Sequence, residues 1–198
     1  MGKVEGNKLQ KERNLLETAF ELFTTKGFAK TSVSDIVERA GVAKGTFYLY
    51  FRDKYEIQNR LIVGKAEHLF HHALSHSNYQ SCAEPVDRII AIVDDILEQM
   101  QRNPELLRFI NKNLSWGIFQ RALSRSETDY LELLQTILGR TVEDRQETEL
   151  LVYTVIELVG ASCHSVILEQ NPTDLQTYKP HLYRSIRAIL GQLSADRK

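Results

Sequence analysis

Apolar residues recur at intervals of three and four positions through most of this chain. That spacing is typical of helices with one buried face, and no segment sustains the apolar–polar alternation of a half-buried strand. The fold is therefore predicted to be all-α. The expected helices run from Asn7 to Gly27, Ser32 to Gly41, Lys44 to Phe51, Asp53 to Ser77, Val86 to Gln101, Pro104 to Leu123, Thr128 to Leu138, Asp144 to Gln170 and Tyr178 to Leu193.

Capping patterns define several of these helix ends. Asn7 is followed by Gln10, and Ser32 by Asp35, at the three-residue spacing of a capping box. We therefore expect the first helix to start after Asn7 and the second after Ser32. Pro180, near the start of the last helix, either opens that helix or kinks it, and the sequence leaves both possibilities open.

The second and third helices are short, and the turn between them contains Gly41. Two such helices have the dimensions of a helix-turn-helix, in which the second helix lies in the major groove of DNA. In that second helix, KGTFYLYF, Phe47 and Phe51 lie four residues apart and can fill a small core. Tyr48 and Leu49 point elsewhere, and exposed residues of this kind need a partner surface.

Duplex DNA would supply that partner surface. A lysine neutralises a phosphate, a glycine lets the backbone approach closely, tyrosine hydroxyls bond phosphates, and a leucine meets a thymine methyl group. Lysine at the start of the next helix and hydroxyls before the second helix add further phosphate contacts. We predict DNA contacts from Thr31, Ser32, Lys44, Gly45, Thr46, Tyr48, Leu49, Tyr50 and Lys54.

The stretch GFAKTSVSDIVERAGVAKGTFYLYFRDK resembles the N-terminal DNA-binding domain of the TetR family of bacterial transcriptional regulators. One departure is Ala43, because the family often has Ser or Thr there, and its absence removes a side-chain cap and a possible phosphate contact. The matched features are the Gly27-Phe28 helix stop, Thr31, Ile36, the Ala40-Gly41-Val42 turn, Lys44-Gly45, Tyr48, Tyr50-Phe51 and Lys54, preceded by Ala19, Leu22 and Phe23.

The resemblance implies a three-helix helix-turn-helix DNA-binding domain over residues 8–54. A larger helical domain for effector binding and dimerisation would follow over residues 55–198. The implied function is a ligand-responsive transcriptional regulator, a repressor that binds a palindromic operator as a homodimer and is released by a small-molecule effector. In such proteins the last two long helices form a four-helix bundle with their symmetry mates. A monomeric core is the alternative that the periodicity leaves open.

Aromatic and polar residues are mixed between Arg102 and Tyr130, as in many ligand pockets. Trp116 precedes Gly117, which could interrupt the helix and leave room. The alternative is that these aromatic residues simply form the core, which is the commoner role at helical spacing. We predict effector contacts from Phe70, Phe109, Asn113, Trp116, Phe119 and Tyr153.

Histidines at positions 68, 72 and 76 follow the four-residue spacing of a helical metal site. A helical metal-binding protein using His68, His72 and His76 is therefore the alternative function. No Cys or paired carboxylate lies nearby, so a solvated helix flank is the simpler interpretation, and neither a metal nor a cofactor is predicted. The motifs of hydrolases, zinc proteases, P-loop proteins and dinucleotide enzymes are absent from the sequence, so no enzyme is predicted. A protein-interaction module is a further alternative.

The charge of the chain is unevenly distributed. Its 25 Lys and Arg against 26 Asp and Glu give a net charge of −1, which at first argues against a nucleic-acid binder. Residues 1–65, however, contain twelve basic and eight acidic residues, and the remainder contains thirteen and eighteen. A basic N-terminal part therefore precedes an acidic body, whose charge would restrict DNA contact to one part of the molecule.

The rest of the sequence favours a cytoplasmic protein without a membrane partner. The first ten residues lack the apolar core of a signal peptide. Cys82 and Cys163 make no disulfide framework. The apolar run Leu150–Leu168 contains Glu157 and His164, so we interpret it as a buried helix and not as a membrane span.

Overall fold

The computed structural model describes residues 3–111, 116–123, 130–138 and 145–191, and within these ranges the chain is helical and contains no strand. The all-α prediction is confirmed. The chain divides into two compact units, residues 1–64 and 65–198. The boundary between the units falls inside one helix, α4 (Lys54–His76), which belongs to both.

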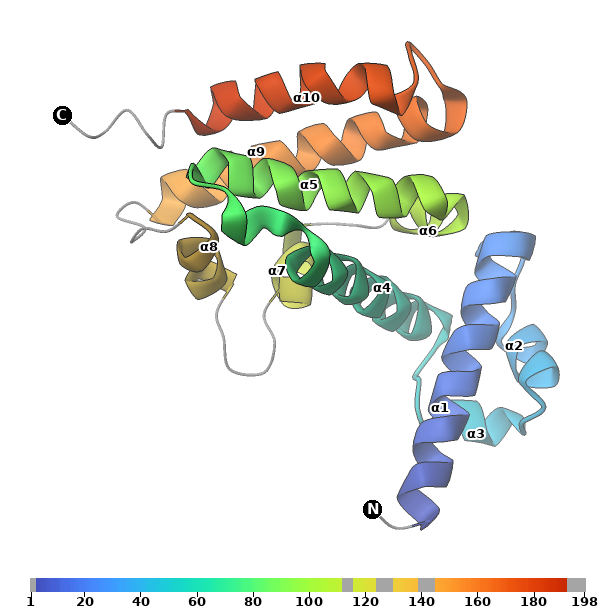
Figure 1. The fold of residues 1–198 in the computed structure, drawn as a ribbon. Helices are drawn as coiled ribbons and strands as arrows, with labels where there is room; N and C mark the ends of the chain where they lie inside the picture. The colour runs from blue at the N-terminus through green and yellow to red at the C-terminus, as the bar shows by residue number, and fades with distance from the viewer. Residues whose placement is uncertain (1–2, 112–115, 124–129, 139–144, 192–198) are drawn as a thin grey trace. The chain divides into compact units, whose positions relative to one another are not determined.

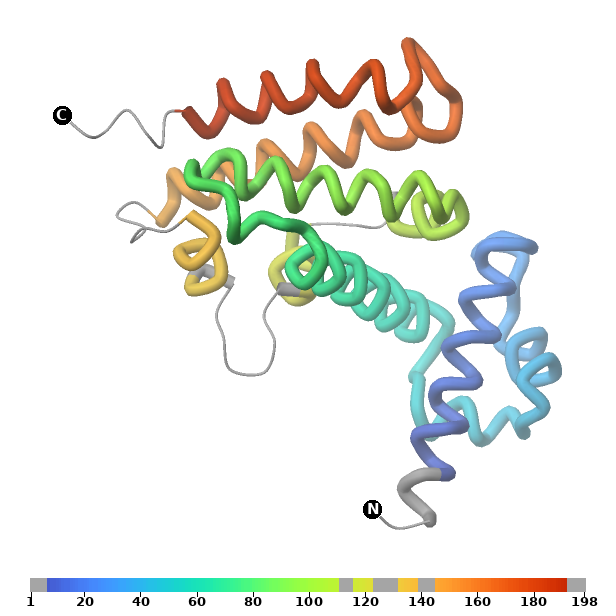
Figure 2. The backbone as a smooth tube through the Cα atoms, viewed as in Figure 1, coloured from blue at the N-terminus to red at the C-terminus, as the bar shows by residue number. Residues whose placement is uncertain are grey.

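The first unit begins with α1 (Lys3–Leu22), which continues as a π-helical turn, η1 (Phe23–Gly27). The short helices α2 (Val33–Ala40) and α3 (Lys44–Tyr48) follow, joined by a tight turn (Figures 1 and 2). Together with α1 they form the predicted three-helix domain with its helix-turn-helix. Its core consists of buried side chains from every helix of this unit, among them Leu15, Ala19, Ile36, Phe47, Phe51 and Ile57.

The Ser32 capping box is confirmed. The Ser32 hydroxyl accepts a hydrogen bond from the N–H of Asp35, and the Asp35 carboxylate accepts one from the N–H of Ser32 at 2.7 Å. At the other end of α2, Gly41 has φ of +66° and its N–H donates to the Glu38 carbonyl. The left-handed backbone at Gly41 turns the chain from α2 into α3, and glycine adopts it without strain.

The prediction that Asn7 starts the first helix is wrong, because α1 begins at Lys3. No residue between Lys3 and Gly6 is proline, so nothing in this stretch forces the helix to stop. A capping pattern can therefore stand inside a helix when the preceding residues are able to extend it.

The second unit contains the C-terminal part of α4 and the helices that follow it. These are η2, a 3₁₀ turn (Asn78–Ser81), α5 (Pro85–Arg102), α6 (Pro104–Asn111), α7 (Trp116–Leu123), α8 (Tyr130–Leu138), α9 (Arg145–Cys163), its π-helical continuation η3 (His164–Glu169) and α10 (Leu175–Leu190). α10 packs against both α5 and α9, and α8 packs against α5 (Figure 1).

Three further predicted helix extents need correction. The helix expected over Lys44–Phe51 ends at Tyr48, and the chain continues as a turn. The helix expected over Pro104–Leu123 is split into α6 and α7, with residues 112–115 outside the described ranges. The last helix begins at Leu175, three residues earlier than expected, because the Asp174 carboxylate accepts the N–H of Thr177 at 3.0 Å and caps it. Pro180 therefore lies inside α10 and does not open it. Thr128 and Asp144, expected as helix starts, lie outside the described residues.

A charged cluster around the buried Lys179 joins α10 to α5. The Lys179 ammonium is buried against the Asp94 carboxylate and lies 3.5 Å from an oxygen of Glu98. The Tyr183 hydroxyl donates a hydrogen bond to Asp94. Burial, and then the Asp94 carboxylate, raise the pKa of Tyr183 well above its ordinary value, so this hydroxyl keeps its proton.

One segment, Arg145–Glu169, is long and apolar enough to cross a membrane by length and composition alone. A core helix of a soluble protein meets the same two criteria. One face of α9 is buried within the chain, through Leu151, Val155 and Val159, as expected for a packed helix. On another face the side chains of Leu150 and Tyr153 are 52% and 41% exposed, so the second unit by itself covers this helix only in part.

Candidate nucleic-acid interface

The short helix α3 and the three residues that follow it, 49–51, divide their side chains between a buried and an exposed face. Phe47 and Phe51 are 0% and 1% exposed, and their rings meet with centroids 5.5 Å apart. Tyr48 and Leu49 are 53% and 77% exposed. Leaving a tyrosine and a leucine in water next to a well-filled core is unusual for a packing helix, and exposed apolar residues of this kind commonly mark a binding surface.

Two residues at the start of α3 extend this exposed face. Lys44 and Gly45 are both exposed, and a Cβ placed on Gly45 would meet no atom within 4 Å. Among the described residues Lys44 has no ion-pair partner. Thr46 and Tyr50 are half-buried at the edges of the same face. We call Lys44, Gly45, Thr46, Tyr48, Leu49 and Tyr50 the α3 surface.

Several basic residues elsewhere in the first unit pair with carboxylates of the same unit. Lys26 lies 2.9 Å from Asp35, and Arg60 lies 2.6 Å from Glu12. The Lys26 ammonium, together with hydrogen bonds from Ser32, lowers the pKa of Asp35 to about 2. The unpaired ammonium of Lys44 is therefore the group on the α3 surface best suited to neutralise an anion.

Thr31 and Lys54 have internal roles in addition to the DNA contacts predicted for them. The buried Thr31 hydroxyl donates to the Gly27 carbonyl at 2.8 Å. The Lys54 ammonium donates to the carbonyls of Phe28 and Thr31 at 2.8 and 2.9 Å. Both side chains thus hold the segment between η1 and α2 in place. The sequence did not predict this structural role. Ser32 is exposed, although its hydroxyl serves the capping box.

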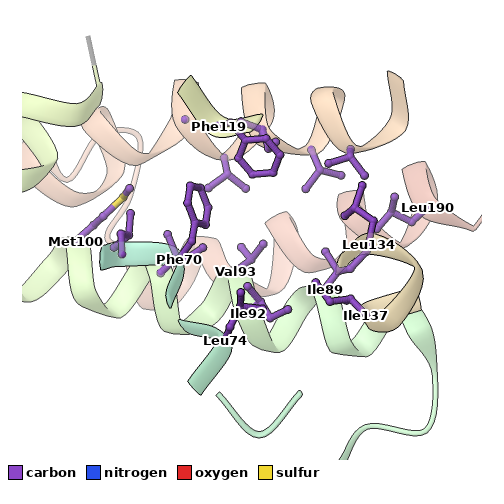
Figure 3. Close-up of a pocket in the computed structure, with 17 residues that line it drawn as sticks. Phe70, Leu74, Ile89, Ile92, Val93, Met100, Phe119, Leu134, Ile137 and Leu190 are labelled. Atoms are coloured by element: carbon purple, nitrogen blue, oxygen red, sulfur yellow. The ribbon is translucent and has the colours of Figure 1, made fainter. Parts of the chain in front are cut away.

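A cavity of about 130 Å³ lies within the second unit (Figure 3). Its walls come from α4, α5, α7, α8, α9 and α10. Two of the predicted effector residues line it: the rings of Phe70, from α4, and Phe119, from α7, meet edge to face with centroids 5.1 Å apart. Every described lining residue is apolar or glycine, and the aliphatic ones include Ile89, Val93, Ile96, Leu134, Val155 and Ile156.

The other predicted effector residues lie outside the cavity lining or outside the described ranges. Trp116 stacks on Phe119, a lining residue, with ring centroids 5.2 Å apart. Tyr153 meets Trp116 edge to face, and Phe109 is buried. Asn113 lies outside the described residues. The aliphatic lining on α5, α8 and α9 was not predicted, because lining and core residues share the same helical spacing.

The histidine cluster on α4 makes internal contacts. His72 Nδ1 lies 3.1 Å from a carboxylate oxygen of Asp95, and the rings of His72 and His76 stack with centroids 4.0 Å apart. His76 Nδ1 lies 3.0 Å from the carbonyl oxygen of His72. Within the part of the chain that the structure describes, no group of three or more His, Cys, Asp or Glu side chains is arranged to hold a metal ion. The alternative of a metal-binding protein is not supported.

Known proteins match both the N-terminal unit and the whole fold. Residues 15–61 match the family described as bacterial regulatory proteins, tetR family. The HTH-type transcriptional regulator YvdT of Bacillus subtilis is 25% identical over 194 residues, covering 91% of this chain and 95% of YvdT. The HTH-type transcriptional repressor KstR of Rhodococcus jostii is 28% identical over 143 residues, 71% of this chain and 64% of KstR.

Solved structures support the same fold assignment. A TetR-family transcriptional regulator from Streptomyces coelicolor superimposes with a TM-score of 0.69 at 18% identity, covering 93% of this chain and 98% of that one. A TetR-family regulator from Shewanella sp. PV-4 gives 0.65 at 19% identity, with coverages of 90% and 95%. Taken with the helix-turn-helix of α2 and α3, these matches show that residues 15–61 form a DNA-binding domain of the TetR-family type and that the chain has the fold of TetR-family transcriptional regulators.

Proposed function

We propose that this protein is a repressor that acts in the bacterial cytoplasm, binds a palindromic operator as a homodimer, and is released from it by a small-molecule effector. The observation that carries the proposal is the division of α3 and the turn after it into a buried Phe47–Phe51 pair and an exposed face with Tyr48 and Leu49. A DNA-binding domain over residues 8–54 and an effector and dimerisation domain over residues 55–198 are part of this proposal.

The α3 surface would lie in the major groove. There Lys44 neutralises a phosphate, Gly45 lets the backbone approach the DNA, and Leu49 contacts a thymine methyl group. The hydroxyls of Tyr48 and Tyr50 bond phosphates and Thr46 bonds a base edge. Ser32 adds a further proposed contact. Thr31 and Lys54 contribute by holding in place the segment that leads into α2.

The homodimer would form through α9 and α10. The exposed Leu150 and Tyr153 give α9 an apolar face that its own chain leaves open. Ala161, a small and exposed residue on the same helix, permits a close approach by another helix. A two-fold dimer carries two copies of α3 and suits a palindromic site with half-sites about 34 Å apart.

The effector would bind in the cavity of the second unit. Phe70 lines this cavity and belongs to α4, the helix that begins at Lys54 in the DNA-binding unit. A ligand that binds better when α4 is displaced would shift the population towards a form that no longer fits both half-sites. The ligand produces this change only through its different affinities for the two forms.

The experiment that tests this proposal is DNase footprinting on the region upstream of the protein's own gene. Sedimentation equilibrium of the free protein and of its complex with the protected fragment accompanies it. We expect a two-fold symmetric footprint, and a complex that contains an even number of chains. Binding no tighter than to unrelated DNA of the same length and salt concentration would contradict the proposal, as would a footprint without symmetry.

A further inference from the structure

The lining of the cavity restricts the chemistry of its ligand. The described residues around it contribute hydrocarbon side chains, the thioether of Met100, and glycine. A charged or hydrogen-bonding group placed inside would lose its water partners and gain none from the described lining side chains. A polar group therefore binds there unfavourably. An apolar group binds favourably, because it removes apolar surface from water.

The lining also restricts the shape of the ligand. On α5 it extends from Ile89 to Met100, which is about 16 Å along the helix axis at 1.5 Å per residue. On α9 it extends from Val152 to Gly160, or about 12 Å. Figure 3 shows Met100 and Leu190 at opposite ends of the lining. The lining is therefore elongated along α5 and α9, around a cavity of about 130 Å³.

We propose that the cavity binds a linear aliphatic chain, inserted methyl end first, with any polar group of the ligand held outside the lining. The inference rests on the proposed function, in which this cavity is the effector site, and it names the ligand class. An apolar cavity of about 150 Å³ stays dry and binds a six-carbon hydrocarbon. By that comparison, the cavity accommodates an alkyl segment of about six carbons before its walls must move.

Trp116 provides a built-in reporter for this binding. It is the only tryptophan of the chain, and it stacks on Phe119, which lines the cavity. A chain that displaces or covers the Phe119 ring changes the surroundings of the indole. Tryptophan fluorescence therefore reports cavity binding independently of DNA and can be compared with calorimetry.

The test uses 1-butanol, 1-hexanol and 1-octanol as probes of the full-length protein without DNA, with 1,8-octanediol as the matched probe. We expect affinity to rise about fourfold for each methylene that enters the cavity, and to level off for carbons that stay outside. Octanediol should bind at least about tenfold more weakly than octanol, because it must bury a hydroxyl. Equal affinity for octanol and octanediol, or affinity independent of chain length, would overturn the proposal.

Two variants fill the cavity from different helices. Gly160→Leu acts from α9, where an added Cβ meets nothing within 4 Å, and Val93→Phe acts from α5, away from the proposed dimer face. Gly64→Leu is the matched control, an exposed helical glycine outside the cavity with equally open surroundings. We expect either cavity variant to lose octanol binding and Gly64→Leu to retain it. Octanol binding that survives in a folded Val93→Phe protein would also overturn the proposal.

The alcohol titrations and the upstream-DNA footprint test the ligand class and the proposed function independently of each other. A protein that binds its upstream DNA but none of the alcohols refutes the aliphatic ligand and leaves the proposed regulator standing. A protein whose affinity for the alcohols rises with chain length as expected, but which binds no specific DNA, refutes the proposed function. The chemistry assigned to the cavity then stands.

Discussion

The Lys54 ammonium lies 2.8 Å from the carbonyl oxygen of Phe28 and 4.3 Å from the centre of the Phe28 ring. The same ammonium also donates to the Thr31 carbonyl. One side chain at the start of α4 therefore fixes the segment that leads into α2, which in turn supports α3. The contact ties the geometry of the helix-turn-helix to the first residue of the helix that continues into the second unit.

Replacing Lys54 with Met should reduce the stability of the protein even in the absence of DNA. The substitution removes two charge-assisted hydrogen bonds from a partly buried site and leaves their carbonyls to water. We expect the free energy of unfolding to fall by about 1–2 kcal/mol, measured by urea denaturation. Lys44→Met is the control. Because Lys44 is exposed, this substitution should leave the denaturation midpoint unchanged. Equal effects of the two substitutions would show that Lys54 has no structural role.

Asp35 should contribute a pH-dependent part of the stability. Lys26 and Ser32 hold its pKa at about 2, below the ordinary value of 3.8. Since the folded pKa is the lower one, the contribution is complete above about pH 4 and is lost as the pH falls towards 2. The difference in unfolding free energy between the parent and Asp35→Asn should shrink over this interval in urea denaturations at a series of pH values. A difference that stays constant from pH 5 to pH 2 would rule out this linkage.

The exposed side chains of α9 should control oligomeric state. Leu150→Glu combined with Tyr153→Glu places two charges on the face proposed for the dimer, and the desolvation of those charges opposes association. Sedimentation should then show a monomer, with tertiary packing judged intact by near-ultraviolet circular dichroism. Ser75→Glu, at an exposed polar position on α4, should remain dimeric. If the double variant has the same mass as the parent, the dimer forms elsewhere.

Gly45→Ala should lower the affinity for DNA without lowering the stability of the fold. Its added Cβ meets no atom of the protein within 4 Å, and alanine is the better helix former, so stability should be unchanged or slightly increased. On the proposed interface the methyl group lies between the backbone and a phosphate, and affinity for the upstream DNA should fall by about tenfold or more. Fluorescence anisotropy measures the affinity and urea denaturation the stability. Unchanged affinity would show that α3 does not approach the DNA at Gly45.

The sequence predicts the N-terminal unit better than the second one, for physical reasons. Short helices with strong local signals leave few alternatives: the Ser32 capping box and the left-handed Gly41 define α2 by themselves. Phe47 and Tyr48 are likewise assigned to opposite faces by helical spacing alone. The start of α1 is different, because the Asn7 signal competes with residues that can extend the helix.

The cavity shows where periodicity stops being informative. Phe70 and Phe119 were predicted to line an effector site, and they do line the cavity, but Val93 and Val155 follow the same pattern as the core residues around them. Whether an aliphatic side chain faces a neighbour or an empty space depends on how several helices pack. That arrangement is a tertiary property that no local pattern encodes. The resemblance of Gly27–Lys54 to one family concerns the DNA-binding unit and carries no information on this packing.

The central claim, that α3 binds operator DNA, is tested most directly by the salt dependence of binding to the upstream fragment. The parent, Lys44→Ala and Arg108→Ala are compared, since Arg108 is an exposed cation on α6 outside the α3 surface. If each Lys44 of a dimer neutralises one phosphate, Lys44→Ala should reduce the slope of log affinity against log salt concentration by about two, while Arg108→Ala leaves it unchanged. A Lys44→Ala protein with the parent's slope and affinity would contradict the account.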